Sequence, residues 1–288
     1  MHAWPAARGV LKPWGHARSS EDAMVAENEV LLDVTRGGAA IITLNRPDKH
    51  NAFNADIIAR LSDIFETLRA NADEARVVFI RGAGKSFSAG ADLEWMQAAA
   101  DWTHADNVED ALGLARMLHK LHDLPQFTVA LVQGAAMGGG AGLMAACDAA
   151  VAVKDARIRF SEVRLGLTPA TISPFVVRAI GSRWAKALYA SGEGFDGAFA
   201  HQIGLAQYLV ETADELDDMM EHLGQLAFHT APGAVADAKK LVDMVAEADI
   251  DDGLLRKTAH QIADRRASAE GKEGLAAFLE KRKPYWAE

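Results

Sequence analysis

The chain has 288 residues, of which 50% are hydrophobic and 24% are charged, and this composition is typical of a globular protein with a sizeable core. A formal net charge of -10 argues against nucleic acid as the main partner, because phosphate neutralisation needs clustered Lys and Arg. No apolar run approaches the ~20 residues of a membrane-spanning helix, so we expect a soluble protein without a membrane partner. The single cysteine, Cys147, excludes an internal disulfide and fits a reducing, cytoplasmic location.

The first twenty residues contain no Asp or Glu, which is a feature of transit peptides. Pro5, Gly9, Pro13 and Gly15 would however break the amphipathic helix that such a peptide needs. We therefore expect a disordered tail over residues 1–23, ahead of the patterned sequence that begins at Met24.

The patterned part opens with two β-rich runs, Val30 to Thr35 and Ala40 to Leu44, which are joined at two glycines and predict a hairpin. Asn54 is the expected N-cap of a following amphipathic helix. A short apolar strand, Val77 to Arg81, comes next. The apolar positions at helical spacing are Ile57, Leu61, Ile64, Phe65 and Leu68.

This alternation of strands and helices recurs through "EDALGLARMLHKLHDL", "TVALVQG", "AAVAV" and "RIRF". The segment 171–226 reads as mostly helical, and residues 230–288 read as helices alone. No proline-rich linker divides the chain. We predict one α/β core over residues 24–225, with a helical C-terminal part over residues 226–288.

Two glycine-rich segments carry the chemistry that the sequence indicates: "GAGKSFSAGADLEWM" and "VQGAAMGGGAGLMAA" each run from a strand into a helix. Main-chain N–H groups at a helix N-terminus are unpaired and carry the positive end of the helix dipole, so they suit an anion. Two converging amides would form an oxyanion hole worth roughly 3 kcal/mol for each donor. Two ordinary glycine turns explain the spacing equally well.

Four blocks decide between these alternatives: "SFSAGADLEWM", "VQGAAMGGGAGLMAACDAAVA", "FSEVRLGLTP" and "EGKEGLAAFLEKRKPYW". In order and spacing they resemble the crotonase superfamily, the enoyl-CoA hydratases and isomerases, over about residues 28–288. The resemblance implies a spiral of repeated ββα turns with a C-terminal helical part that mediates trimers, often paired into hexamers. It also implies an acyl-CoA substrate, with coenzyme A as part of that substrate and no separate cofactor.

Carried over by position, the resemblance puts the oxyanion amides on Ala91 and Gly139. It places coenzyme A near two segments, Lys49 to Ala52 and Ala89 to Asp92. The basic cluster Lys281 to Lys283 either touches coenzyme A phosphates or is a solvated charge run. The residues predicted to bind substrate are Lys49, Ala52, Ala89, Gly90, Asp92, Gly138 and Gly142.

The family's hydratases typically hold water between two glutamates, whereas this sequence has Gly142 at the first position and Glu162 at the second. An apolar surround would raise the pKa of Glu162 towards the range useful for proton transfer. We therefore predict that Glu162 is the catalytic acid and base. An ion pair of Glu162 with Arg159 or Arg164 is the competing structural interpretation.

A single glutamate permits water addition to an enoyl-CoA or migration of its double bond, and the missing acid also allows a catalytically silent acyl-CoA-binding protein. The segments "GGGAGL", "SEVRLGL" and "PATISPFV" are similar to those of bacterial hydratases that act on branched acyl-CoA esters such as methylglutaconyl-CoA. This similarity favours hydration. A distal carboxylate on such a chain would be received by Arg164, or by Thr171 and Ser173 at a helix start. His119 and His122 lack further ligands, so we predict no metal site.

Overall fold

The computed structural model describes residues 28–287, in which short strands and helices alternate as far as residue 210. The predicted tail, residues 1–23, lies outside the described residues. None of the helices between residues 28 and 287 has the length and apolar character needed to cross a bilayer.

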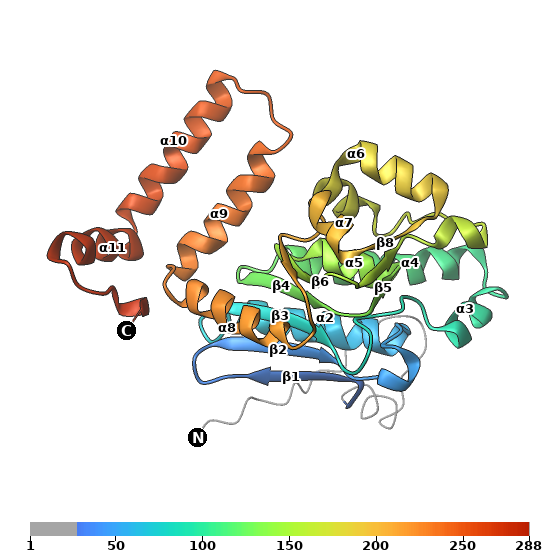
Figure 1. The fold of residues 1–288 in the computed structure, drawn as a ribbon. Helices are drawn as coiled ribbons and strands as arrows, with labels where there is room; N and C mark the ends of the chain where they lie inside the picture. The colour runs from blue at the N-terminus through green and yellow to red at the C-terminus, as the bar shows by residue number, and fades with distance from the viewer. Residues whose placement is uncertain (1–27, 288) are drawn as a thin grey trace.

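A six-stranded sheet forms the centre of the molecule, in the order β1-β2-β3-β4-β6-β9 (Figure 1). β1 and β2 pair antiparallel, which confirms the predicted hairpin, and the remaining neighbours are parallel. All five residues of β6 are buried, as expected of a parallel strand covered on both faces. The strands are β1 (Val30–Val34), β2 (Ala39–Leu44), β3 (Val77–Gly82), β4 (Phe127–Val132), β6 (Ala149–Val153) and β9 (Tyr208–Val210).

A second sheet of three short strands lies beside the first and carries the segments of the site. β5 (Ala135–Met137) pairs parallel with β7 (Arg157–Arg159), and β7 pairs antiparallel with β8 (Gly194–Asp196). The sequence did not predict β5, β8 or β9, because three residues are too short to display a period of two. The interpretation of residues 171–226 as mostly helical therefore missed two strands.

The helices of the core begin where the caps predict. α2 (Ala55–Ala70) starts at Asn54, whose side chain accepts a hydrogen bond from Ile57 N at 3.0 Å, and its predicted apolar positions are all buried. α2 packs on α4, α4 on α5 and α5 on α6, which forms one helical layer. The other core helices are α3 (Leu93–Ala99), α4 (His104–His122), α5 (Gly139–Ala146), α6 (Ser173–Ser191), α7 (Gly197–Gln202) and α8 (Glu215–Phe228).

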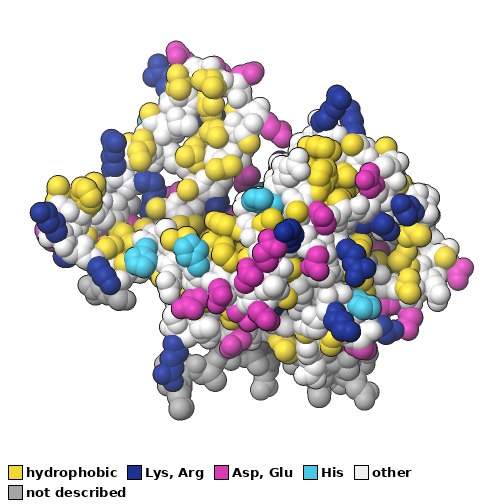
Figure 2. Space-filling view, viewed as in Figure 1, with side chains coloured by type: hydrophobic (Ala, Val, Ile, Leu, Met, Phe, Trp, Pro, Cys, Tyr) yellow, Lys and Arg dark blue, Asp and Glu magenta, His cyan; other side chains and the backbone are white. Residues whose placement is uncertain are grey.

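The last three helices project away from this core (Figure 1). They are α9 (Pro232–Val245), α10 (Asp252–Ala267) and α11 (Ala269–Glu280), and neither α9 nor α10 has a buried residue. α8 is the last helix that packs on the six-stranded sheet, and the predicted boundary at residue 226 falls in its final turn. Figure 2 shows hydrophobic side chains gathered on the surface of the projecting helices.

Candidate active site

The two glycine-rich loops meet in the structure, as the predicted oxyanion hole requires. The loop after β3 runs alongside β5, with hydrogen bonds from Ser88 N to Ala135 O and from Met137 N to Ser88 O, both 2.9 Å. Gly90 has φ +87°, and a Cβ on it would lie 2.7 Å from Met137 O and 3.6 Å from Gly139 N. Glycine is therefore needed at this position, because any side chain would push the two loops apart.

The N–H groups of Ala91 and Gly139 donate no hydrogen bond within residues 28–287. The amides just before them are used, since Gly90 N donates to Ser88 Oγ at 3.2 Å and Gly138 N donates to Arg159 O at 2.9 Å. Gly139 is the first residue of α5, where an unpaired amide is expected. Ala91 differs from the prediction, because it lies before the N-cap of α3 in an extended segment bridged to Phe53.

Glu162 follows β7 at the start of the short helix η2 (Glu162–Leu165). Its Oε1 lies 3.2 Å from the position that a Cβ on Gly138 would take, so the carboxylate sits beside the glycine that precedes Gly139. Its Oε2 is buried and has no hydrogen-bond partner among the described residues. Burial raises the pKa of Glu162 above its ordinary value, because the charged form loses its hydration.

No ion pair joins Glu162 to an arginine in the described part of the chain. The Arg159 guanidinium instead lies against Gly194, where a Cβ would come within 2.8 Å of its Nη2. Arg164 lies beside Gly192 in the same way. The competing interpretation of Glu162, as half of a structural ion pair, therefore has no support in the geometry.

The position of the missing acid is filled by an apolar side chain. A Cβ on Gly142 would lie 2.2 Å from Ile172 Cγ2 and 2.8 Å from Ile172 Cβ. Gly142 and Ile172 are both buried, and Leu118 lies 3.6 Å from the same point. No side chain fits at residue 142 in this structure, so the glycine is required by packing.

The two segments predicted to bind coenzyme A lie side by side, joined by a hydrogen bond of 2.9 Å from Ala89 N to His50 O. Lys49, at the end of the short helix η1 (Pro47–Lys49), forms an exposed ion pair of 2.8 Å with Glu94. Ala52 is buried, and its carbonyl oxygen accepts a hydrogen bond from Arg46. In the predicted basic cluster, Arg282 is already paired with Glu273 and Glu280.

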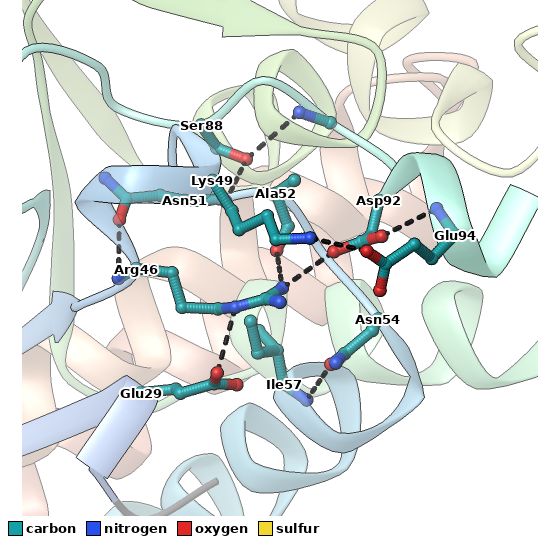
Figure 3. A network of polar contacts seen from close by, with 11 residues as sticks. Glu29, Arg46, Lys49, Asn51, Ala52, Asn54, Ile57, Ser88, Asp92 and Glu94 are labelled. Atoms are coloured by element: carbon teal, nitrogen blue, oxygen red, sulfur yellow. Dashed lines mark hydrogen bonds and ion pairs between the residues drawn. The ribbon is translucent and has the colours of Figure 1, made fainter. Parts of the chain in front are cut away.

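Arg46 is a residue of the site that the sequence analysis missed (Figure 3). Its Nη1 donates to Asp92 Oδ2 at 3.1 Å and to Ala52 O at 3.0 Å, and its Nε lies 3.0 Å from Glu29 Oε1. The other oxygen of Asp92 caps α3 by accepting from Glu94 N at 2.8 Å. Burial opposes ionisation of Asp92, but the hydrogen bonds from Glu94 N and Arg46 outweigh it and lower the pKa of Asp92.

Asn51 extends this network beneath the loop that carries Ala91. Its side-chain Oδ1 accepts a hydrogen bond from Arg46 N at 2.8 Å, and its Nδ2 donates to Ser86 O at 2.7 Å. Its main-chain carbonyl oxygen accepts a hydrogen bond from Ser88 Oγ at 2.9 Å. Asn51, Ser88 and Asp92 are all buried. Because every member has a partner, the network fixes the loop around Ala91 rather than weakening the core.

Comparisons with known proteins agree with this geometry. A family model described as enoyl-CoA hydratase/isomerase matches residues 35–288. A short-chain-enoyl-CoA hydratase of Clostridium acetobutylicum is 30% identical over 258 residues, which cover 89% of this chain and 96% of that protein. The crystal structure of an enoyl-CoA hydratase from Shewanella pealeana matches with a TM-score of 0.87 and 37% identity, over 94% of this chain and 100% of the other. Pseudomonas aeruginosa AtuE matches with a TM-score of 0.86 and 35% identity, over 90% and 100%.

Proposed function

The chain belongs to the enoyl-CoA hydratase/isomerase family, and on this premise we propose that it adds water reversibly across the 2,3 double bond of an enoyl-CoA thioester. The predicted crotonase-type fold with a helical C-terminal part is confirmed by the matching solved structures. The hydration itself is supported by the Clostridium relative, which is described as a short-chain-enoyl-CoA hydratase.

One observation carries the proposal: the buried, unpartnered Oε2 of Glu162 belongs to a carboxylate beside the loop that presents Gly139. The free N–H groups of Ala91 and Gly139 would grip the thioester oxygen and stabilise the enolate that forms when water attacks the β-carbon. Glu162 would take the proton from that water and return it to the α-carbon. A carboxylate whose pKa is raised by burial suits both transfers.

Coenzyme A would enter as part of the substrate, with no further cofactor. We place it along the paired segments 49–52 and 89–92, where Lys49 is exposed at the surface. Lys281 and Lys283 stay candidates for its phosphates, because the described residues give neither an ion pair. Arg282 is a weaker candidate, since two carboxylates already neutralise it.

For the acyl group we propose a branched or carboxylated chain such as methylglutaconyl, in the breakdown of branched-chain amino acids or fatty acids in the cytoplasm. Its support is the resemblance of "SEVRLGL" and "PATISPFV" to hydratases of such chains. Arg164 is exposed and remains a candidate for a distal carboxylate. Ser173 is a poorer one, because its hydroxyl lies 2.6 Å from Pro169 O and donates to it.

The runner-up is double-bond isomerisation, and one observation favours it. Ile172 covers Gly142, so the second acid of a two-glutamate hydratase has no place here. A single buried carboxylate is sufficient to move a proton from one carbon of an enolate to another. Hydration therefore needs another group to hold the water, whereas isomerisation does not.

The test is a panel of straight, branched and carboxylated 2-enoyl-CoA and 3-enoyl-CoA esters, with products identified by mass spectrometry. Hydroxyacyl-CoA from the 2-enoyl esters supports hydration, and 2-enoyl product from the 3-enoyl esters alone supports isomerisation. Glu162→Gln should lower kcat by at least about a hundredfold for either reaction. Glu193→Gln, which changes an exposed carboxylate, is the matched control. Full activity in Glu162→Gln would reject both functions.

We also propose that the protein assembles as a homotrimer or a pair of trimers through its C-terminal helices. Ile250, Leu275, Phe278 and Leu279 are more than half exposed on these helices or in the loop between them. Leu275, Phe278 and Leu279 lie three and four residues apart on α11 and share one face, and an exposed apolar face of this kind is usually covered by another protein surface.

A further inference from the structure

A hollow of about 630 Å³ lies on the three-stranded sheet, beside β7, β8 and the start of α7. Its apolar part comes from Met137 of β5, Phe195 of β8 and Phe199 of α7, and the ring centroids of the two phenylalanines are 5.7 Å apart. Two arginines of β7, Arg157 and Arg159, line the same hollow. It therefore combines apolar and basic side chains.

The pairing of the strands explains why these side chains share a face. Met137 is the register partner of Arg159 on one side, and Gly194 is its partner on the other. Side chains at paired positions point to the same face of a sheet, and the next residue along each strand points to the opposite face. That opposite face carries Ala136 and Ile158, which are fully buried in the core. One face of the sheet thus completes the core, and the other holds the hollow.

The two arginines of the hollow lack a counter-charge. Neither Arg157 nor Arg159 forms an ion pair with any residue between 28 and 287. Arg159 is half-buried, and its Nε has no hydrogen-bond partner in the same range. Gly194 makes room for this guanidinium, because a Cβ at residue 194 would lie 2.8 Å from Arg159 Nη2. A half-buried cation has lost part of its hydration, so it favours an anionic group in the hollow.

Two acids, Glu193 and Asp196, stand at the rim of the same hollow. Oδ1 of Asp196 caps α7 by accepting a hydrogen bond from Phe199 N at 2.8 Å. Neither acid is paired with an arginine in the part of the chain that the structure describes. A partner that matches this surface must therefore present charges of both signs in addition to an apolar side chain.

The loop between α9 and α10, residues 246–251, has these features. Its Ile250 is 85% exposed, which is the largest exposed fraction among the large hydrophobic side chains of residues 28–287. Asp249 precedes Ile250, Asp252 begins α10, and Arg256 follows one helical turn later on the same face as Asp252. All three charged side chains are exposed, and none forms an ion pair within the described residues. Figure 1 shows this loop at the far end of the projecting helices.

The shape of the loop is fixed by its own hydrogen bonds. Asp251 Oδ1 caps α10 by accepting from Leu254 N at 2.7 Å. Asp251 N donates to Asp249 O at 3.0 Å, on either side of Ile250. A segment that is already ordered loses little conformational entropy when it binds, so this loop is suited to insertion into a preformed hollow.

We propose that the loop 246–251 of one copy inserts into the hollow of a second copy, with Ile250 against its apolar part. Asp249 and Asp252 then face the two free arginines of the hollow, and Arg256 faces the two acids at its rim. The buried isoleucine provides affinity, whereas the charges fix the orientation of the contact. This inference rests on the proposed assembly and names the surface that receives the C-terminal helices.

The symmetry of this contact agrees with a trimer. The loop and the hollow are different surfaces of one chain, so their contact is heterologous, and such contacts close into a ring when the rotation between copies fits. A ring of three copies needs contacts of this kind, because isologous contacts join copies in pairs. Every loop and every hollow is then occupied.

Reversing the charges tests whether the two surfaces meet. Asp249→Lys with Asp252→Lys, and separately Arg157→Glu with Arg159→Glu, should each raise the protein concentration of half-dissociation at least about tenfold in sedimentation measurements. Combining both pairs of substitutions should return this concentration to within about threefold of wild type, because opposite charges again face each other.

Asp214→Lys with Asp218→Lys makes the same change of charge at two exposed acids in and before α8, and is the matched control. Its concentration of half-dissociation should stay within about twofold of wild type. Circular dichroism verifies that all variants are folded.

Cysteine cross-linking gives a second measurement that leaves the arginines of the hollow unchanged. In a Cys147→Ala background, chains with Ile250→Cys are co-expressed with chains of different length that carry Glu193→Cys. A short bifunctional thiol reagent should link the two kinds of chain at least about tenfold more than it links either kind to itself, because a heterologous contact brings loop to hollow and not loop to loop. Leu31→Cys in place of Glu193→Cys is the control and should give no link.

The outcomes separate this contact from the proposed function. Loop-to-loop links as abundant as loop-to-hollow links would overturn it, and so would equal dissociation in the charge-reversal control. An assembled protein in which neither the cross-link nor the charge effect is found would also overturn it, leaving the assembly to α11 and the hollow to another partner or a small ligand. A monomeric wild-type chain would reject the assembly and the inference together. Hydration of the ester panel is measured separately and is unaffected by any of these results.

Discussion

The site and the C-terminal helices use polar and apolar residues in opposite ways. Around the site, Asn51, Ser88 and Asp92 are buried and hydrogen-bonded, and they hold a loop whose useful groups are main-chain amides. On α11, in contrast, Phe278 is 80% and Leu279 78% exposed. The core therefore buries and pairs its own polar side chains to position the site. The C-terminal part instead exposes apolar side chains that a single chain leaves uncovered.

One lysine of α9 makes polar contacts between the C-terminal helices and the core. Lys239 of α9 donates to Leu124 O at 2.6 Å and Gln126 O at 2.8 Å, and pairs with Asp148 at 2.7 Å. α9 itself has no buried residue. These polar contacts of one lysine therefore contribute to docking α9 on the core.

The largest expected effect comes from breaking the ion pair that supports Ala91. Arg46→Met leaves the Asp92 carboxylate, which is 5% exposed, without its counter-charge, and should cost about 3–5 kcal/mol of unfolding free energy. For a chain of this size we expect Tm to fall by roughly 10 °C in thermal unfolding followed by circular dichroism. Arg282→Met removes the exposed pairs of the C-terminal part and should leave Tm close to wild type.

The pH dependence sharpens the same test. The folded-state pKa of Asp92 is lowered, so its contribution is present above the ordinary Asp value of about 3.9 and is lost as pH falls through the folded value. The difference in Tm between wild type and Arg46→Met should therefore shrink in acid. If the difference in Tm keeps the same size below pH 3, the loss of stability comes from the packing of the aliphatic part of the Arg46 side chain and not from its charge.

A smaller loss is expected from adding one methyl group at Gly142. Ala at this position would place its Cβ 2.2 Å from Ile172 Cγ2 and should cost about 1–3 kcal/mol, and Ile172→Ala in the same chain should restore part of it. Gly253→Ala on α10 is the matched change, because its Cβ meets only the Asp251 side chain, at 3.2 Å. We expect no loss of Tm there, since alanine favours the helix. Equal losses at both glycines would contradict the role of Ile172.

The elements of the fold could be predicted from the sequence wherever the apolar pattern was long enough. Asn54 and the apolar positions of α2 predicted that helix correctly, and the glycines after Thr35 predicted the hairpin. Gly194 to Asp196 could not be recognised as a strand, because a three-residue strand forms only by pairing with β7. Tertiary pairing decides such segments, and local sequence does not contain it.

Some residues of the candidate site could likewise be predicted from the sequence, and others could not. Glu162 and the loops of Ala91 and Gly139 lie in contiguous motifs, so their positions could be read from the resemblance alone. Arg46 and Asp92 are 46 positions apart, and nothing in the sequence distinguishes their pairing from that of other charged residues. Ile172 was missed for the same reason, since the direction of its side chain, against Gly142, depends on the fold.

The apolar surface of α11 provides the next prediction. Phe278→Ser with Leu279→Ser should dissociate the proposed trimer, giving a mass near 30.9 kDa by size-exclusion chromatography with light scattering. Because association stabilises the folded chain, we expect Tm to fall by a few degrees and to lose its dependence on protein concentration. Leu31→Ser, at a 43% exposed leucine on β1, is the matched control. A wild-type chain that is already monomeric would reject the assembly.

The smallest expected change has the opposite sign and belongs to the site. The folded-state pKa of Glu162 is raised by burial, so the folded chain resists ionisation, and stability falls as pH rises from the ordinary Glu value of about 4.3 through the folded value. Glu162→Gln removes this cost and should raise Tm by about 1–3 °C at neutral pH, with no gain below pH 4. Glu247→Gln, at an exposed carboxylate after α9, should change nothing. A gain of the same size in both variants would mean that net charge, and not the burial of Glu162, sets the effect.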